Sequence, residues 1–396
     1  MMSLRDILER TEQYTVEIIN GRNRNRFDRC YRVFLFLLSR AYRNVVQLRL
    51  TLFDNLLLRQ HVLGCFVVSV GNLTVGGTGK TPVVELLSRT LADRERRVAI
   101  LSRGYRSKPR PFLERLRARF SNDGEGVPPK VVSDGRTVLL DSGQAGDEPY
   151  MLARNLVAKN GRMGVAVVVD KDRVKGGKYA INHFQADTLI LDDGFQYLRL
   201  RPWINILLVD STNPFHNHEA LPCGLLREPI KNLRRADYIF LTKSNGGTHL
   251  RHLRRFLRRC NPRAEIIECN HEPCYLQHVL TDERQELSAL SGRRVAAISA
   301  IAVPESFENY LTALGGEIVY RKRFVDHHRY TERELLSFCT EAMRQGAEYL
   351  VTTEKDAVRL PRLPVDIPPF YFLRVEIKIL SGLDAFHKCI TRICLS

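Results

Sequence analysis

Paired cysteines and long apolar runs are both missing from this chain of 396 residues. Its nine cysteines are scattered: none forms a CxxC motif, and none lies near histidine at a spacing that holds zinc. The pattern predicts reduced thiols in a cytosolic protein rather than a disulfide framework. The first residues, MMSLRDILERTEQY, carry mixed charges and no apolar signal core, so we do not expect export.

Acidic residues are scarce relative to basic ones. The chain has 44 Asp and Glu against 61 Lys and Arg, which gives a formal net charge of +17. Such a charge predicts affinity for an acidic partner, which could be nucleic acid, an anionic lipid surface or a phosphorylated substrate. The hydrophobic content of 44% is ordinary for a soluble globular protein, and the length indicates two domains.

Residues 1–60 differ from the rest of the chain. No run of about 18 uncharged apolar residues occurs there, so a membrane-spanning helix is not expected. On a helix, residues 33–58 instead form two opposite stripes. The polar stripe comprises Arg40, Arg43, Asn44, Gln47, Thr51 and Asp54, and the apolar stripe comprises Phe34, Leu38, Ala41, Val45, Leu48, Leu52 and Leu56. Two interpretations remain open: this helix lies in a bilayer interface, or its apolar face packs on the neighbouring domain.

From residue 65 onward, short β-branched runs alternate with helical patterns. The alternation predicts an α/β fold at 61–270, with a doubly wound parallel sheet whose ligands bind beyond the carboxyl ends of the strands. The glycine-rich stretch GNLTVGGTGKTP (71–82), which follows the first of these strands, makes this fold the P-loop NTPase type. A second, smaller α/β domain is expected at 271–380, joined by extended linkers. We expect residues 381–396 to form a helix that returns to the first domain, and residues 1–60 to form a basic amphipathic segment that associates with a membrane.

The most informative stretch is GNLTVGGTGKTP (71–82), between a predicted strand and a predicted helix. This order is typical of a nucleotide triphosphate site, because the glycines let backbone N–H groups approach phosphate oxygens. Lys80 can reach the β- and γ-phosphates, and the Thr81 hydroxyl can ligate magnesium. The common GxxxxGK[ST] pattern would need glycine where this chain has Thr74. The expected cradle for ATP and Mg²⁺ comprises Thr74, Gly76, Gly77, Thr78, Gly79, Lys80 and Thr81.

Two pairs of acidic residues lie at the ends of predicted elements. Asp192 and Asp193 end a hydrophobic strand, where a carboxylate can hold magnesium opposite the P-loop hydroxyl, although adjacent acids there also serve as helix caps or turn residues. Asp147 and Glu148 precede a predicted helix. A carboxylate at that place could accept the proton of an attacking hydroxyl, and helix N-capping is at least as good an explanation.

Three further segments carry polar side chains that could take part in chemistry. His327 follows Asp326 in FVDHHRYT, and an adjacent aspartate can orient a histidine base, although such a pair also occurs in surface loops. Arg103 and Tyr105 follow a predicted strand and could contact a phosphorylated or sugar substrate. The acids and lysine of TTEKDAVRL (352–360) could equally form an exposed turn.

Together these motifs resemble one family, the tetraacyldisaccharide 4′-kinases of lipid A biosynthesis. The stretches that carry the resemblance follow the family's order between residues 65 and 361: SVGNLTVGGTGKTP, LSRGYRS, GDEPYMLAR, LDDGFQ, LPCGLLREP, ADYIFLTK, IAVPESF, DHHRYT and TTEKDAVRLP. Thr74 in the glycine loop is also similar to this family. The chain departs from it at Tyr197, where the family usually has histidine, and at Cys223 and Leu225.

The resemblance implies transfer of the ATP γ-phosphate to the 4′-hydroxyl of a tetraacylated glucosamine disaccharide 1-phosphate. The product would be the bis-phosphorylated lipid A precursor. Asp147 would be the general base, in a dyad with His327 and with Asp326 behind it. The other implied roles are phosphate binding by Lys80, metal binding by Thr81, Asp192, Asp193, Glu148 and Gln196, and substrate contact by Arg103 and Tyr105.

Such an acceptor stays in the bilayer, so the resemblance implies an enzyme at an anionic membrane surface. It would be peripheral or monotopic, on the cytoplasmic face of the inner membrane, where ATP is available. The N-terminal helix and a basic loop at 103–120 suit that surface. The alternatives are a nucleic-acid-dependent P-loop ATPase and a non-catalytic, membrane-bound one. We do not expect nucleic acid as a partner, because the basic clusters lack the interleaved aromatic residues that stack on bases.

Overall fold

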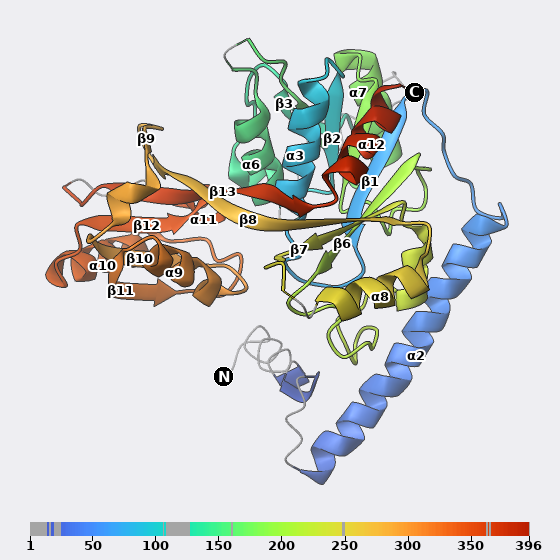
Figure 1. Cartoon of the computed structure of the whole chain (residues 1–396), viewed down its shortest axis with the longest axis horizontal. Helices are drawn as coiled ribbons and strands as arrows, with labels where there is room; N and C mark the ends of the chain where they lie inside the picture. The colour runs from blue at the N-terminus through green and yellow to red at the C-terminus, as the bar shows by residue number, and fades with distance from the viewer. Residues whose placement is uncertain are drawn as a thin grey trace.

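One continuous sheet organises the described part of the chain (Figure 1). The computed structural model describes residues 14–15, 17–19, 25–105, 107, 127–159, 161–247, 250–361, 363 and 366–395. The basic loop expected at 103–120 therefore lies largely outside the described residues. The order of the strands is β11-β10-β12-β13-β8-β7-β6-β1-β5-β2-β4-β3, with β9 paired to β8.

The strands divide into two groups along this sheet. The first group is β1 (Phe66–Asn72), β2 (Val98–Ser102), β3 (Lys130–Asp134), β4 (Ala166–Val169), β5 (Thr188–Asp192), β6 (Ile204–Asp210), β7 (Tyr238–Thr242) and β8 (Glu265–His278). The second is β9 (Arg284–Gln285), β10 (Arg294–Ser299), β11 (Glu317–Arg323), β12 (Tyr349–Thr353) and β13 (Phe370–Ser381). The described neighbours pair in parallel except at β3–β4, β8–β13 and β8–β9. The prediction of a parallel-dominated α/β sheet is confirmed.

Helices cover both faces of the first group of strands, as a doubly wound sheet requires. Because side chains alternate along a strand, Val68 of β1 packs on one face with α3 (Lys80–Ala92), α6 (Asp147–Leu156) and α12 (Leu383–Cys394). Val67 packs on the other face with α7 (Arg173–Phe184). Farther along that face, α8 (Leu250–Cys260) and η1 (Ile230–Arg235) cover the region around β6 and β7.

The second group of strands is also covered on both faces. Helix α10 (Glu332–Arg344) packs on one face and α9 (Pro304–Ala313) on the other. The long strand β8 connects the two groups, because its first residues pair with β7 and the remainder pairs with β13. Strand β8 runs through residue 270, where the sequence suggests a domain boundary, and the division into domains stays a prediction.

Helix α7 has no strong apolar period in the sequence and was not predicted. Two adjacent glycines, Gly176 and Gly177, lie inside it, and glycine lowers helix propensity. The structure shows why a side chain does not fit there: a Cβ on Gly177 would come within 2.5 Å of Leu63 Cδ1. The glycine therefore permits close packing of the helix on the sheet while weakening the sequence signal for a helix.

Helix α2 (Arg26–Asp54) lies along the side of the molecule, and Figure 1 shows its first part extending beyond the sheet. Its described contacts with the body of the protein include several hydrogen bonds. The Ser39 and Tyr42 hydroxyls donate to backbone carbonyls at 2.8 and 3.0 Å, and Gln47 donates to the Asn232 side chain at 3.2 Å. Leu50 and Phe53 are the buried apolar residues in its last turns.

The apolar stripe of α2 faces away from the protein. Phe34, Val45 and Leu48 have exposed fractions of 54, 65 and 59%. The interpretation in which this stripe packs on the neighbouring domain is therefore wrong. A contiguous exposed apolar surface of this kind usually marks an interaction site. No helix in the described ranges combines the length and the apolar character needed to cross a membrane.

His271 of β8 lies against the glycine loop that follows β1. A Cβ on Gly79 would come within 2.8 Å of the His271 Cε1 atom. Burial, with a smaller effect of the Lys243 charge, lowers the pKa of His271 to about 4. The His271 ring is therefore neutral near pH 7, because burial disfavours its charged form.

We predict an acid-dependent loss of stability that His271 causes. Between pH 6.5 and 4 the unfolded chain binds a proton at this site and the folded protein does not, so the free energy of unfolding falls as the pH falls through that window. In His271→Gln the free energy of unfolding should fall by about 2 kcal/mol less than in the wild type, once the pKa shift of His271 is discounted for the partial exposure of its ring. Urea unfolding at pH 7, 5.5 and 4 measures this free energy, and His387→Gln, at an exposed position, is the control. Equal slopes in the wild type and His271→Gln would contradict the prediction.

Candidate active site

The glycine loop is fixed at the carboxyl edge of the sheet, between β1 and α3. Gly76 and Gly79 have φ angles of 116° and 78°, which residues with side chains rarely adopt. Asn72 Nδ2 donates to the hydroxyl of the buried Thr78 at 3.0 Å, and Thr242 Oγ1 donates to the Thr78 carbonyl at 2.9 Å. These contacts hold the loop open around the first turn of α3, where backbone N–H groups are free to bind an anion.

Asp192, the last residue of β5, is buried with one free oxygen. Its Oδ2 atom accepts a hydrogen bond from Ser102 Oγ at 3.1 Å, and its Oδ1 atom has no partner among the described residues. Burial and the carboxylates of Glu148 and Asp193 raise the pKa of Asp192 to about 7, and the Lys80 charge opposes them. A cation beside the free oxygen would offset both causes of this shift.

Asp193 has a different environment, although it is the next residue. Its φ angle is 53°, and both carboxylate oxygens accept from Arg227 Nη1, at 3.0 and 2.8 Å. The Lys80 Nζ atom lies 3.6 Å from Asp193 Oδ1. Burial raises the pKa of Asp193, and the charges of Lys80 and Arg227 outweigh it, so the net shift is downward. Asp193 is therefore ionised and holds two basic side chains in the site.

Gln196 supplies a second free oxygen near the glycine loop. Its Nε2 atom donates to the Asn72 carbonyl at 3.0 Å, and its Oε1 atom is buried without a partner among the described residues. Across the described ranges, no group of three Asp, Glu, His or Cys side chains forms a closed metal site. Magnesium usually takes one or two protein oxygens and completes its shell with phosphates and water. The free oxygens of Asp192 and Gln196 and the Thr81 hydroxyl fit that kind of site.

Asp147, the first residue of α6, faces three basic side chains. Arg359 Nε donates to its Oδ2 atom at 2.8 Å, and His327 Nδ1 lies 3.5 Å from the same oxygen. Arg329 Nη2 donates to Oδ1 at 3.0 Å. Burial raises the pKa of Asp147, but the hydrogen bond to His327 and the two arginine charges outweigh it and lower the pKa overall. The carboxylate makes no capping hydrogen bond, so the N-cap interpretation is wrong.

His327 lies between a carboxylate and two cations. Its Nδ1 atom is 3.2 Å from Arg359 Nη2, and its Nε2 atom is 3.3 Å from Lys355 Nζ and 3.9 Å from Asp326 Oδ2. Nδ1 can donate a proton to Asp147 or accept one from Arg359, but it cannot do both at once. The tautomer of His327 therefore decides whether it supports the Asp147 carboxylate directly.

These residues share one large cavity. It has a volume of about 2220 Å³, and it is lined by every candidate site residue that the sequence suggested except Thr74. Thr74 forms a β-bridge with Leu226 instead. Tyr105 is 64% exposed, and its ring centre lies 5.9 Å from that of His327.

Several basic residues of the site were not assigned a role from the sequence. Arg173 follows β4 and is 6% exposed, its guanidinium lies 4.9 Å from the centre of the Tyr197 ring, and its Nε atom is buried without a partner among the described residues. The same strand-end argument that identified Asp192 could have identified Arg173. Arg227 and Arg359 lie in quoted motifs, but their partners are far away in the sequence.

The segment TTEKDAVRL does not form an exposed turn. Its first two residues, Thr352 and Thr353, end β12, and the next four form α11 (Glu354–Ala357). Asp356 of this helix is fully buried and accepts from Arg359 Nη1 at 3.1 Å. Lys355 contacts Glu148 at 3.3 Å, so this helix reaches the cavity from the second group of strands.

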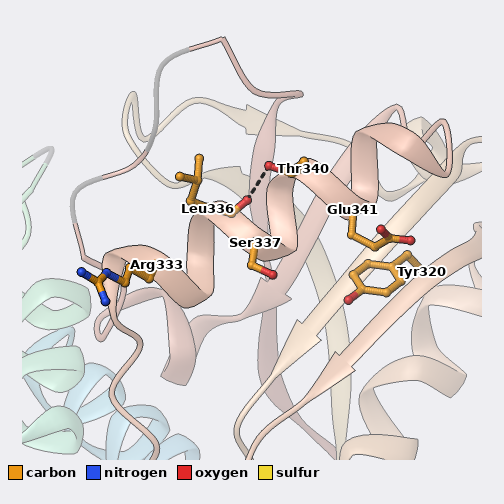
Figure 2. Close-up of a pocket in the computed structure, with 6 residues that line it drawn as sticks. All are labelled: Tyr320, Arg333, Leu336, Ser337, Thr340 and Glu341. Atoms are coloured by element: carbon orange, nitrogen blue, oxygen red, sulfur yellow. Dashed lines mark hydrogen bonds between the residues drawn. The ribbon is translucent and has the colours of Figure 1, made fainter.

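Another hollow, of about 680 Å³, lies on α10 beside β11 and is distinct from this cavity. Figure 2 shows its lining, in which the Thr340 hydroxyl bonds back to the Leu336 carbonyl of its own helix. The hollow holds none of the candidate site residues. The large cavity is therefore the candidate active site.

Comparisons with known proteins identify the family of this chain. The family model of tetraacyldisaccharide-1-P 4′-kinase matches residues 31–394. The tetraacyldisaccharide 4′-kinase of Anaeromyxobacter dehalogenans (strain 2CP-C) is 39% identical over 360 residues, which are 90% of this chain and 89% of that protein. The corresponding protein of Halothermothrix orenii is 32% identical over 394 residues, 95% of this chain and 96% of its own length.

A solved structure is also similar over nearly the whole chain. It is the crystal structure of LpxK from Aquifex aeolicus, an "apo" form in complex with ATP, with 29% identity and a TM-score of 0.69. The alignment covers 92% of this chain and 99% of that one. The resemblance inferred from the motifs is confirmed, and the chain belongs to the tetraacyldisaccharide-1-P 4′-kinase family.

Proposed function

We propose that this protein transfers the γ-phosphate of ATP to the 4′-hydroxyl of a tetraacyldisaccharide 1-phosphate. One observation carries the proposal beyond family membership: the glycine loop and the Asp147 carboxylate line the same cavity. A phosphate donor on the loop and a hydroxyl acceptor beside Asp147 would therefore face each other. Phosphoryl transfer needs little more than such positioning, together with compensation of negative charge.

The donor side of the cavity supplies positive charge. The N–H groups at the start of α3 would bind the phosphates, and Lys80, held by Asp193, would reach the γ-phosphate. We assign the metal to Thr81, Asp192 and Gln196, because the buried free oxygens belong to the last two. Magnesium bound there would neutralise charge on the β- and γ-phosphates.

The acceptor side supplies a base. Asp147 Oδ2 is occupied by Arg359 and His327, whereas Oδ1 accepts only from Arg329 among the residues that the structure describes. Each carboxylate oxygen can accept two hydrogen bonds, so the 4′-hydroxyl would approach Oδ1. The arginines lower the pKa of Asp147, which makes it a weak base before the reaction. In a loose transition state the hydroxyl loses its proton late, so a carboxylate of lowered pKa can still accept that proton if it orients the hydroxyl.

The acceptor is expected to come from a membrane. Helix α2 presents its apolar stripe outward, while Tyr42, Val46 and Leu50 on its other side line the cavity. We propose that α2 lies in the headgroup region of an anionic leaflet, so that an acylated sugar can reach the cavity without leaving the bilayer. The protein would be peripheral or monotopic on the cytoplasmic face of the inner membrane. The cavity edge would then open toward the lipid.

A transfer assay tests the proposed function. Purified protein is given ATP labelled in the γ-phosphate and a tetraacyldisaccharide 1-phosphate in mixed micelles, with and without magnesium. We expect a labelled bis-phosphorylated lipid that depends on magnesium and is lost in Lys80→Ala, because the γ-phosphate then lacks its cation. ATP binding without any labelled lipid would contradict the proposal and favour a non-catalytic module.

Asp147→Asn should reduce kcat by about 10²- to 10⁴-fold, because the amide can orient the acceptor hydroxyl but cannot take its proton. The dissociation constant of ATP should change by less than about 3-fold, since Asp147 lies on the acceptor side. The amide still accepts from Arg359, which limits the cost of leaving that buried cation without a carboxylate. Initial rates and ATP titration measure the two effects. Wild-type kcat in a folded variant would show that Asp147 is not the base.

Polar substitution of the α2 stripe should weaken membrane binding. The triple variant Leu38→Ser, Val45→Ser and Leu48→Ser removes side chains that are exposed in the structure, so the protein should stay folded and sediment with anionic liposomes at least 10-fold less. The control is Leu336→Ser with Met343→Ser on α10, whose side chains are 54 and 43% exposed. If both variants sediment like the wild type, α2 is not the membrane-binding surface.

A further inference from the structure

A buried group of charges lies at the wall of the cavity, which its member Glu354 lines. Arg374 of β13 is 4% exposed, and its Nη1 atom donates to both carboxylate oxygens of Glu354 at 2.8 Å. Its Nη2 atom donates to Glu85 of α3, which is 5% exposed. Asn155 of α6 bridges the two acids, since its Nδ2 atom lies 3.1 Å from Glu85 Oε2 and 2.7 Å from Glu354 Oε1. We call these four side chains the Arg374 cluster.

Each acid or amide of the Arg374 cluster lies on an element that carries a candidate catalytic group. Glu85 is four residues after Thr81 on α3. Asn155 is on α6, which begins at Asp147. Glu354 begins α11, and the next residue is Lys355, which contacts both Glu148 and His327. The cluster therefore joins the elements that position phosphate, base and histidine.

Buried charges hold helices together only at a large desolvation cost. Burying three charges costs hydration, and replacing a buried ion pair by apolar side chains of similar size is often neutral or stabilising. An apolar contact between α3 and β13 would tolerate small shifts. The fork of an arginine between two carboxylates fixes direction as well as distance. The geometry is therefore better suited to holding three helices in one relative position than to stability alone.

We propose that the Arg374 cluster is a positioning device for phosphoryl transfer, which fixes α3 with its bound phosphates against the Asp147 end of α6 and the Lys355 end of α11. The reaction it serves is the proposed function, and the inference rests on that function for its effect on rate. The coupling of the three helices does not depend on the identity of the acceptor. Nucleotide binding at α3 should therefore be transmitted to α6 and α11 through Arg374.

The first test compares kcat between variants of the cluster and the wild type. In Arg374→Met the stem of the side chain remains and the fork is lost, so we expect kcat to fall about 10- to 100-fold, as for a displacement of about 1 Å, with KM for ATP and for the lipid within about 3-fold. Asn155→Leu breaks the bridge from α6 without leaving a charge unpaired, and it should also lower kcat. Because the cluster acts as a unit, the double variant should lose little more than the worse single variant.

The matched control is Arg254→Met. Arg254 pairs with Glu268, which is as buried as Glu85, but the pair joins α8 to β8, and neither residue lines the cavity. This variant should lower the melting temperature and leave kcat near the wild-type value. If Arg374→Met and Asn155→Leu fold and keep wild-type kcat, or lose no more than Arg254→Met, the proposal is wrong.

The second test needs no lipid, so it separates this proposal from the proposed function. Hydrogen exchange is followed with and without ATP. In the wild type, ATP should slow hydrogen exchange in α3, α6 and α11. In Arg374→Met, ATP should slow hydrogen exchange in α3 alone. The proposal is wrong if ATP slows exchange in α6 and α11 equally in both proteins, or does not slow it there in the wild type. If the wild type gives this result but no labelled lipid, the function is wrong and the coupling stands.

Discussion

The ion pair between Asp147 and Arg359 is the interaction on which the candidate active site depends. The Arg359 side chain is fully buried, and 212 residues of chain separate it from Asp147. Arg359 also donates to Asp356 and to the Ala300 carbonyl, so it ties α6 to the second group of strands. Removing Arg359 would leave Asp147 and Asp356 without the buried cation that they share, at a cost of about 3–5 kcal/mol. The two groups of strands are therefore joined beside the cavity by one shared cation.

Three aspartates near the glycine loop show how basic neighbours determine what a carboxylate can do. Asp147 and Asp193 are each held by two cations and keep pKa values below the ordinary range. Asp192 is more buried, faces other carboxylates and has its pKa raised to about 7. A divalent cation would therefore gain most beside Asp192, where it relieves repulsion, and least beside Asp193, where it would compete with Lys80 and Arg227. The adjacent acids thus have separate tasks.

Local pattern was enough to predict many of the polar residues that line the cavity. Asp192, Lys80 and Arg103 were found because they follow or begin elements at the carboxyl edge of a parallel sheet, where ligands bind. The same reasoning could not show that Arg359 meets Asp147, because that contact depends on how the long strand β8 directs the chain into the second group of strands. The local motif also could not show that Thr74 pairs with Leu226 of another loop, and its place in the phosphate cradle stays a prediction.

Helix α2 shows a further limit of pattern reasoning. Its two stripes were evident from the sequence, but amphipathicity does not say which stripe meets the protein. In the structure a third, mixed face meets the protein through hydrogen bonds from Ser39, Tyr42 and Gln47 to the segments around 220–232. Most of the polar stripe stays exposed as well, at Arg40, Asn44, Thr51 and Asp54. This orientation leaves Val45 and Leu48 exposed, as the proposed contact with a membrane requires. The inward face of the same helix places Tyr42 at the cavity.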